Sequence, residues 1–310
     1  MREIVITKND AGQRLDKFLQ KSLRLPPALM YRYLRKKRIK RNGQRAAGGD
    51  VLREGDRLSL YIGDEFFEAA PRARHTGFPP PQIIYEDESV LVLNKPQGLL
   101  SHGGPEEDTL INRMLGYLES TGAYDPAAEM SFAPALCNRL DRNTGGLVLA
   151  AKTAAALRAL NAYIRDRSIR KYYSCLVRGC PPAPAGELAG NLYKDGSRNI
   201  AGLRAQAGPD AKPVLLRYRV VERGRRTSLL EVELCTGRTH QIRVQLAGIG
   251  CPVAGDPKYG DPVFNRELGL RWQALFASRL AFHIPAGDPV LSGLAGRTVA
   301  LPAPPIDHCP

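Results

Sequence analysis

The chain has 310 residues, 43% of them hydrophobic, and carries a formal net charge of +14. This size allows one large and one small domain with real hydrophobic cores. The start, MREIVITKND, lacks the apolar segment of a signal peptide, and no apolar run approaches the roughly 20 residues that cross a bilayer. We therefore expect a cytoplasmic protein without a membrane span, whose charge favours a polyanion, nucleic acid before membrane surface.

Positive charge is concentrated near the start of the chain. Residues 1–63 hold 16 Lys and Arg against 6 Asp and Glu, and no acid occurs between Asp16 and Asp50. Scattered charge is commonly a solvated face, but an acid-free stretch of this length favours contact with nucleic-acid phosphates. We expect much of that contact to come from four consecutive cations, Arg35, Lys36, Lys37 and Arg38.

The same 63 residues predict a small α/β domain. Residues 12–23 place apolar side chains at helical spacing, and Pro27 begins a second helical segment, PALMYRYLRKKRIK. Asn42-Gly43 is typical of a tight hairpin, and residues 56–63 alternate like a half-buried strand. Two helices, a hairpin and a strand make a domain that is marginal in size but viable alone.

The pattern changes after residue 63. Residues 64–82 contain four prolines and no periodicity, which predicts a linker to a large domain at 83–306. We expect strands and helices there at 83–100, 108–121, 146–152, 153–166, 171–179, 214–235 and 237–250. Their irregular alternation predicts an α+β fold with a mixed, largely antiparallel sheet. The Pro- and Gly-rich stretch 181–213 is predicted to be a long loop or insertion over the active face.

The sequence carries no motif for a metal or nucleotide cofactor. Its six cysteines form no C-x-x-C pair, and its five histidines show no H-x-H or H-x-x-x-H spacing. Cysteines scattered through a chain of this size are typical of reduced thiols in the cytoplasm. Residues 146–153, GLVLAAKT, approach a phosphate-binding loop, but Ala151 replaces the second glycine and the interior is apolar. We expect no cofactor.

One carboxylate stands between two bases in the stretch NRLDRNTGGL, where Asp141 is flanked by Arg139 and Arg142. Taken alone, an aspartate before Asn-Thr-Gly-Gly is usually a turn or cap residue. The two arginines would then be surface charge.

Two distant segments favour a functional role for Asp141. TGRTHQIR supplies Arg243, which on a helix would share a face with Thr239 and His240. The stretch KYY places Tyr173 on a strand, where its ring offers a surface for a base to stack on. An aspartate paired with a buried arginine stays ionised and can act as a nucleophile or base without a metal. A base paired inside RNA would reach it only after flipping out of the stack.

These segments together resemble the RluA-type pseudouridine synthases over most of residues 12–303. NRLDRNTGGL is similar to that family's H-R-L-D-x-x-T-S-G-L, KYYSCLVRG to its K-x-Y-x-A-x-V-x-G, and TGRTHQIRVQL to its T-G-R-T-H-Q-I-R-V-H-L. LVLNKPQGLLSH and GDPKYG match further family segments. The leading stretch LPPALMYRYLRKKRIKRNG resembles the small RNA-binding domain named after ribosomal protein S-four, in the branch that modifies large-subunit ribosomal RNA.

The resemblance implies a fold, a reaction and three site residues. The large domain would adopt the pseudouridine synthase fold and isomerise specific uridines of 23S ribosomal RNA. Asp141 would be the catalytic carboxylate, attacking the ribose or removing a sugar proton, and Arg243 would pair with it. Tyr173 would stack on the uracil, and its hydroxyl would help to remove the carbon 5 proton. Arg139 and Arg142 would contact RNA phosphate or splay the target strand. They would otherwise be surface turn charge, and the two interpretations stand about equal. No metal or other cofactor would be needed, and we expect a monomer.

Three departures from the family pattern keep alternatives open. Asn138 stands where the family often has His, Gly145 replaces a Ser, and Gln245 replaces a His. These changes leave Asp141, Tyr173 and Arg243 in place, but they motivate a second hypothesis, a non-catalytic RNA-binding or ribosome-assembly protein. A third hypothesis is the same chemistry on transfer RNA, because only analogy with the leading domain favours ribosomal RNA.

Overall fold

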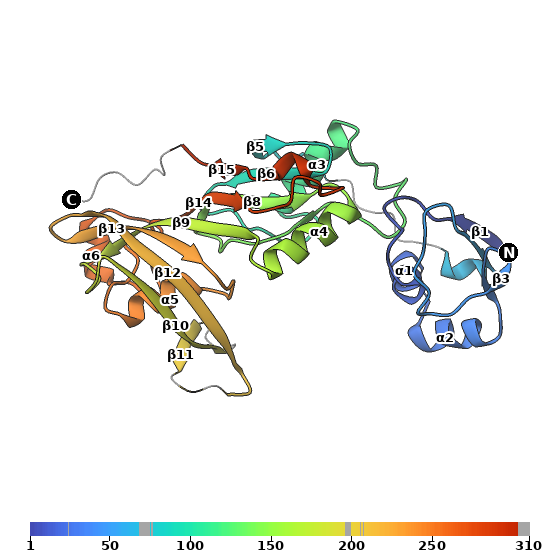
Figure 1. The fold of residues 1–310 in the computed structure, drawn as a ribbon, viewed down its shortest axis with the longest axis horizontal. Coiled ribbons are helices and arrows are strands. Elements are labelled where there is room, and N and C mark those ends of the chain that lie inside the picture. Colours follow the sequence, from blue (N-terminus) through green and yellow to red (C-terminus); the bar gives the residue numbers. More distant parts are fainter. Residues whose placement is uncertain are drawn as a thin grey trace.

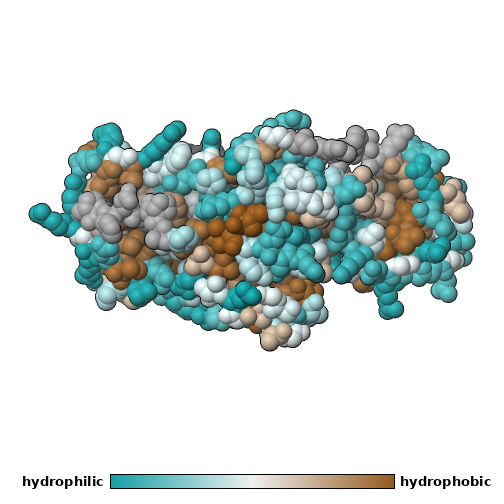
Figure 2. Space-filling model, turned by 90° about the horizontal axis from the view of Figure 1, so that it is seen from above, coloured by the Kyte–Doolittle hydropathy of each residue, from teal (hydrophilic) through white to brown (hydrophobic). Residues whose placement is uncertain are grey.

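The computed structural model describes residues 1–23, 25–67, 75, 77–195, 200–204, 206 and 208–302. In this part of the chain the strands form two sheets, one of four strands and one of eleven, with helices beside both (Figure 1). The expected α+β class is confirmed, and so is the mixed, largely antiparallel sheet, in which β8 and β14 form a parallel pair. Figure 2 shows hydrophilic residues over most of the face seen from above, with smaller hydrophobic groups between them.

The four-stranded sheet belongs to the N-terminal unit. Its elements are β1 (Arg2–Val5), α1 (Leu15–Ser22), α2 (Pro27–Arg35), β2 (Ile39–Arg41), β3 (Gln44–Arg45) and β4 (Arg57–Leu60), in the sheet order β1-β4-β2-β3. Fully buried side chains of both helices, such as Phe18 and Met30, share one hydrophobic core with Ile39 and Leu58 of the sheet. The predicted order of two helices, a hairpin and a strand is confirmed, and β1 was not predicted.

The second helix is shorter than the predicted segment PALMYRYLRKKRIK. It ends at Arg35, Lys37 has a φ of 58°, and Ile39 already belongs to β2. A single left-handed residue is a common way for a chain to leave a helix. The hairpin that follows turns at Asn42 and Gly43, whose φ values of 49° and 78° suit the predicted two-residue turn.

The described part of the predicted linker is not entirely free of structure. Asp64–Phe66 form a short 3-10 helix, and Phe66 and Phe67 pack against the core of the N-terminal unit. The ring of Phe66 meets that of Tyr33 edge-on, with centroids 6.4 Å apart. Residues 68–74 and 76 lie outside the described part of the chain. The large sheet begins at Gln82, the last residue of the predicted linker.

The eleven-stranded sheet forms the framework of the large unit. Nine of its strands follow the order β11-β10-β12-β13-β9-β14-β8-β6-β5, while β15 pairs with β14 and β7 with β8. The strands are β5 (Gln82–Glu86), β6 (Val90–Lys95), β7 (Ala135–Leu136), β8 (Gly145–Ala151), β9 (Ile169–Arg178), β10 (Ala185–Asp195), β11 (Ile200–Arg204), β12 (Ala211–Arg223), β13 (Thr227–Leu234), β14 (Leu275–Phe282) and β15 (Thr298–Ala300).

Four helices and a further 3-10 turn accompany this sheet in the described residues. They are α3 (Leu110–Ser120), α4 (Ala154–Arg165), α5 (Gln241–Gly248), α6 (Pro262–Glu267) and η2 (Ser292–Leu294). The predicted start of α4 is confirmed, because the Thr153 hydroxyl accepts the N–H of Ala156. Fully buried Leu110 of α3 and Leu160 of α4 join the main core with the strands.

The prediction of a long loop at 181–213 was wrong. Most of this stretch forms β10, β11 and the start of β12, an antiparallel part of the sheet, while residues 196–199, 205 and 207 lie outside the described part. Buried Leu192, Ala201 and Val214 pack on Val244 of α5. Because only one face of these strands is covered, few apolar residues are needed, and the stretch reads as polar.

Candidate active site

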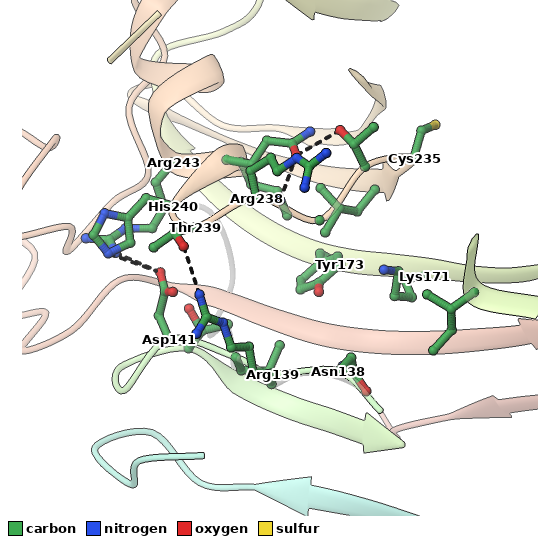
Figure 3. Close-up of a pocket in the computed structure, with 18 of the residues that line it drawn as sticks. Asn138, Arg139, Asp141, Lys171, Tyr173, Cys235, Arg238, Thr239, His240 and Arg243 are labelled. Carbon is green, nitrogen blue, oxygen red and sulfur yellow. Dashed lines mark hydrogen bonds and ion pairs between the residues drawn. The ribbon is translucent and has the colours of Figure 1, made fainter. Parts of the chain in front are cut away.

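A pocket of about 530 Å³ opens between the two halves of the large sheet, along β9 (Figure 3). Its walls come from residues 137–141 and 144, from the end of α4 and the start of β9, and from residues 234–243. Of the described residues that line it, Asp141 is the one carboxylate, among several arginines and Lys171. The predicted residues Asp141, Tyr173 and Arg243 therefore share one pocket, although they are far apart in the sequence.

The loop that carries Asp141 is held in place by hydrogen bonds to its backbone carbonyls. The Ser101 hydroxyl donates to the carbonyl of Leu140 at 2.9 Å. The backbone N–H of Thr144 donates to the carbonyl of Asp141 at 3.0 Å. Gln97 Nε2 donates to the carbonyl of Asn143 at 3.0 Å. Side chains outside the loop thus fix the residues on both sides of Asp141, so its carboxylate is aimed by the fold.

Lys95, at the end of β6, also holds this loop in place. Its side chain is fully buried, and its ammonium donates to the carbonyls of Pro96, Leu99 and Arg142 at 2.9, 2.7 and 3.0 Å. Burial lowers the pKa of Lys95 to about 8, so the ammonium remains protonated at neutral pH. A buried cation shared by three carbonyls ties β6 to the turn after Asp141.

We expect Lys95→Met to lower the free energy of unfolding by about 3 kcal/mol, because three carbonyls lose a charged donor. Met keeps the apolar stem and fills a similar volume. Chemical denaturation of both proteins measures the difference. The exposed Lys17, whose Nζ lies 3.4 Å from Gln20 Oε1, provides the control. If Lys95→Met were as stable as Lys17→Met, the anchoring role would be refuted.

Arg243 joins two carboxylates in one buried network. Its Nη1 lies 2.8 Å from Asp141 Oδ2, as expected from the sequence, and Figure 3 shows both residues at one end of the pocket. Its Nε and Nη2 donate to the two oxygens of Asp256 at 2.7 and 2.8 Å. The side chain of Asp256 is fully buried and that of Asp141 is 26% exposed. Of the two carboxylates, only Asp141 faces the pocket.

The electrostatics of this network keep its charges in place. Burial acts to lower the pKa of Arg243, but the hydrogen bonds and charges of Asp256 and Asp141 raise it overall. Burial likewise acts to raise the pKa of Asp256, but Arg243 and the N–H groups of Lys258 and Tyr259 lower it overall. The guanidinium therefore stays charged and rigid beside Asp141.

Tyr173 lies on β9 with its ring in the pocket. It is 5% exposed, and burial together with the charge of Asp141 raises the pKa of its hydroxyl. The hydroxyl therefore stays protonated at neutral pH and is available as a donor. Because side chains two apart on a strand share a face, Lys171 enters the pocket beside Tyr173, as Figure 3 shows.

The predicted helix at 237–250 begins later than expected, at Gln241. Thr239 and His240 precede it, and His240 has a left-handed φ of 59°, so the expected helical face shared with Arg243 is wrong. The backbone turn nevertheless brings them to the site. His240 Nε2 lies 3.8 Å from Asp141 Oδ2, and its Nδ1 lies 2.8 Å from the hydroxyl of Tyr259.

The two arginines that flank Asp141 differ in position. Arg139 lines the pocket and its Nη2 donates to the Thr239 hydroxyl at 3.0 Å, across the opening (Figure 3). Arg142 is exposed, and its Nε donates to the carbonyl of Gly98 at 3.0 Å. Only Arg139 therefore reaches the pocket that holds Asp141.

Sequence reasoning missed three residues of the site, Asp256, His240 and Tyr259. Asp256 and Tyr259 belong to the segment GDPKYG, which was noted as a family match but given no role. An aspartate so close to Lys258 reads as turn chemistry, and only the fold shows that Arg243 is its partner. His240 was named only for its expected helical face.

The three departures from the family pattern each make local contacts of their own. Asn138 Oδ1 accepts the N–H of Leu149, and Gln245 Nε2 donates to the carbonyl of Leu188 at 2.7 Å. A Cβ at Gly145 would lie 2.8 Å from the ring of Phe276, so this position needs glycine as long as the phenylalanine is there. No hydrogen bond or ion pair joins these three to Asp141 in the described residues.

The described residues offer no evident metal site and no membrane span. Among them, no three His, Cys, Asp or Glu side chains gather as metal ligands would. None of their helices has the length and apolar character needed to pass through a bilayer.

Comparison with known proteins supports the resemblance. The ribosomal large subunit pseudouridine synthase C of Escherichia coli (strain K12) is 34% identical over 302 residues, covering 93% of this chain and 90% of the relative. That of Vibrio cholerae is 33% identical over 298 residues, with the same coverage. The solved structure of human RNA pseudouridylate synthase domain containing 1 shares the fold, with a TM-score of 0.57 and 23% identity over 72% of this chain and 84% of that one. Residues 89–248 match the RNA pseudouridylate synthase family, to which this chain therefore belongs.

Proposed function

We propose that this protein converts specific uridines of large-subunit ribosomal RNA to pseudouridine, with Asp141 as its catalytic carboxylate. Membership of the family and the names of relatives at 34% identity support the reaction and the RNA class. The observation that carries the site is the 2.8 Å ion pair between Asp141 and the buried Arg243, at one end of a pocket that also holds Tyr173.

The reaction is an isomerisation and needs no oxidant or reductant. The bond between uracil nitrogen 1 and the ribose anomeric carbon breaks, the ring turns, and a bond forms from carbon 5 to the same sugar carbon. Carbon 5 loses a proton and nitrogen 1 gains one, so atoms balance. Asp141 attacks the sugar or removes a sugar proton, and on either route Arg243 holds the carboxylate in position.

The other site residues receive roles from their positions. Tyr173 stacks on the flipped uracil, which has left its own stack to reach the pocket. Its protonated hydroxyl can donate a hydrogen bond to the detached ring. A protonated hydroxyl does not itself accept the carbon 5 proton, so the role expected for Tyr173 in removing that proton is limited to assistance. Arg139 contacts the RNA backbone at the pocket mouth, and Arg142 contacts RNA outside it.

The N-terminal unit, proposed as residues 1–63, is an S-four-like RNA-binding domain, joined by the linker 64–82 to the catalytic domain at 83–306. Its four predicted cations are exposed where α2 ends and β2 begins. None of the four has an ion pair in the part of the chain that the structure describes. They are Arg35, Lys36, Lys37 and Arg38.

We expect replacement of these four cations by alanine to weaken RNA binding at least tenfold and to flatten its salt dependence. Each phosphate of duplex RNA that the variant no longer neutralises should lower the slope of log affinity against log salt by about 0.9. Filter binding at several salt concentrations measures both. An equal number of substitutions at Arg2, Arg41, Arg57 and Arg113, which pair with carboxylates, is the control. An unchanged slope would refute the proposal.

One experiment tests the function as a whole. Pseudouridines are mapped in total RNA from cells with and without the gene, and in a large-subunit transcript incubated with the purified protein. We expect uridines of large-subunit RNA to lose modification without the gene and to gain it in vitro. Loss of modification in transfer RNA instead would support the third hypothesis.

The non-catalytic alternative predicts no turnover on any RNA. The departures that motivate it, Asn138, Gly145 and Gln245, are accommodated without disturbing Asp141. A buried arginine kept between two carboxylates is costly unless its charge is used. We further propose that the protein is a cytoplasmic monomer. We also propose that it uses no metal, since the carboxylate itself supplies the chemistry.

A further inference from the structure

The pocket that holds Asp141 and Tyr173 is also lined by a group of cations for which the reaction has no use. These outer cations are Arg165, Arg167, Lys171 and Arg238. Arg165 ends α4, Arg167 follows it with a left-handed φ of 68°, Lys171 lies on β9, and Arg238 precedes α5. Three separate segments thus bring positive charge into the same pocket that holds Asp141.

The outer cations have no ion-pair partners in the described part of the chain, whereas several arginines near them do. Arg217, for example, lies 3.0 Å from Glu187. Nearby acids are already engaged: Asp166 accepts the N–H of Ser168 at 2.9 Å, and Glu233 lies 3.9 Å from Arg170. Neither of these two acids lies within ion-pair distance of an outer cation.

Lys171 is the most constrained of the four. It is half-buried in the pocket wall, and burial lowers the pKa of its ammonium. No hydrogen bond from this ammonium is found among the described residues, although a partly desolvated cation is costly without one. Arg165, in contrast, would be stabilised by the helix dipole of α4 alone. The cost at Lys171 is what points to a missing anion.

We propose that the outer cations form a subsite for the backbone phosphates next to the target uridine, on a single-stranded segment of the RNA. This rests on the proposed function, because it places the uridine on Tyr173 with its ribose toward Asp141. Lys171 then lies about 7 Å along the strand from Tyr173, beyond the edge of the stacked ring. Only a strand pulled out of a duplex can enter so deeply.

The test measures binding, without turnover, on two chemically matched probes. One is a single-stranded pentauridylate, and the other is the same oligomer with uncharged methylphosphonate linkages. We expect the wild-type protein to bind the charged probe at least tenfold more tightly. The variant Arg165→Ala/Arg167→Ala/Lys171→Met should lose most of that preference, and its salt slope should fall by about 0.7 for each phosphate that it no longer neutralises.

The control is Arg223→Ala/Arg225→Ala, which removes exposed charge at the β12–β13 turn and should keep the wild-type preference. If the triple variant does not fold, Arg165→Ala/Arg167→Ala, at two exposed positions, carries the test. A triple variant that retained the full preference for the charged probe would overturn the subsite. If the preference is lost in the variant but the wild-type protein modifies no RNA, the subsite stands and the proposed function fails.

Discussion

Asp141→Asn should lower the rate of pseudouridine formation by about 10⁴-fold or more, while RNA affinity changes by less than about threefold. The amide has the size of the carboxylate but can neither attack a sugar carbon nor accept a proton at neutral pH. Arg243 keeps its two hydrogen bonds to Asp256, so the site remains ordered. Single-turnover assays on a large-subunit transcript give the rate, and filter binding gives the affinity.

The matched control is Asp108→Asn, which neutralises an exposed carboxylate that pairs with Arg113 outside the pocket. It should retain the wild-type rate within about threefold. If Asp141→Asn were as active as this control, Asp141 would not be the catalytic carboxylate, whatever the family of the chain. Loss of RNA binding in Asp141→Asn would instead make it a binding residue.

Much of the fold could be predicted because its signals are local. The Thr153 cap and the apolar spacing after it are enough to locate α4, and Asn42-Gly43 is enough to locate the β2–β3 turn. These features depend on neighbours within a few residues. The observed ends of two helices differ from the predicted ones near Lys37 and His240, which have left-handed φ values. The pattern of side chains does not predict these backbone conformations.

The missed elements depend on distant partners. β10 and β11 bury one face against α5, and the alternation that this requires is weak between Gly186 and Gly202. β14 is a central strand, but its segment ASRLAF mixes polar and apolar residues. The fold accommodates its arginine, because Arg279 pairs with Glu231 at 2.7 Å and stacks over the ring of Tyr172. A partly buried arginine in a strand reads as surface until its partners are known.

The site shows the same division between motif and fold. Asp141, Tyr173 and Arg243 were predicted because each lies in a recognisable motif, and the structure brings their side chains to one pocket. Asp256 was missed because its contact with Arg243 spans a turn and a helix that sequence spacing does not define. The sequence assigned no role to Lys171, the residue before the two tyrosines. Its position in the pocket wall depends on the assembled fold, which sequence spacing does not show.

Arg243→Met should lower the free energy of unfolding by about 3–5 kcal/mol, because it leaves the fully buried carboxylate of Asp256 without its cation. The backbone N–H groups of Lys258 and Tyr259, at 2.8 and 3.1 Å, compensate for part of that charge. The rate should fall by about 10²- to 10³-fold, since Asp141 also loses the donor that aims it. Denaturant unfolding and single-turnover rates measure the two effects.

The double variant Arg243→Met/Asp256→Asn separates these effects. A neutral amide at 256 removes the unpaired buried charge, so we expect at least half of the lost stability to return. The rate should remain as low as in Arg243→Met, because nothing replaces the guanidinium beside Asp141. If activity returned together with stability, Arg243 would serve only to neutralise Asp256. Stability unaffected by either substitution would mean that the buried pair contributes to aim alone.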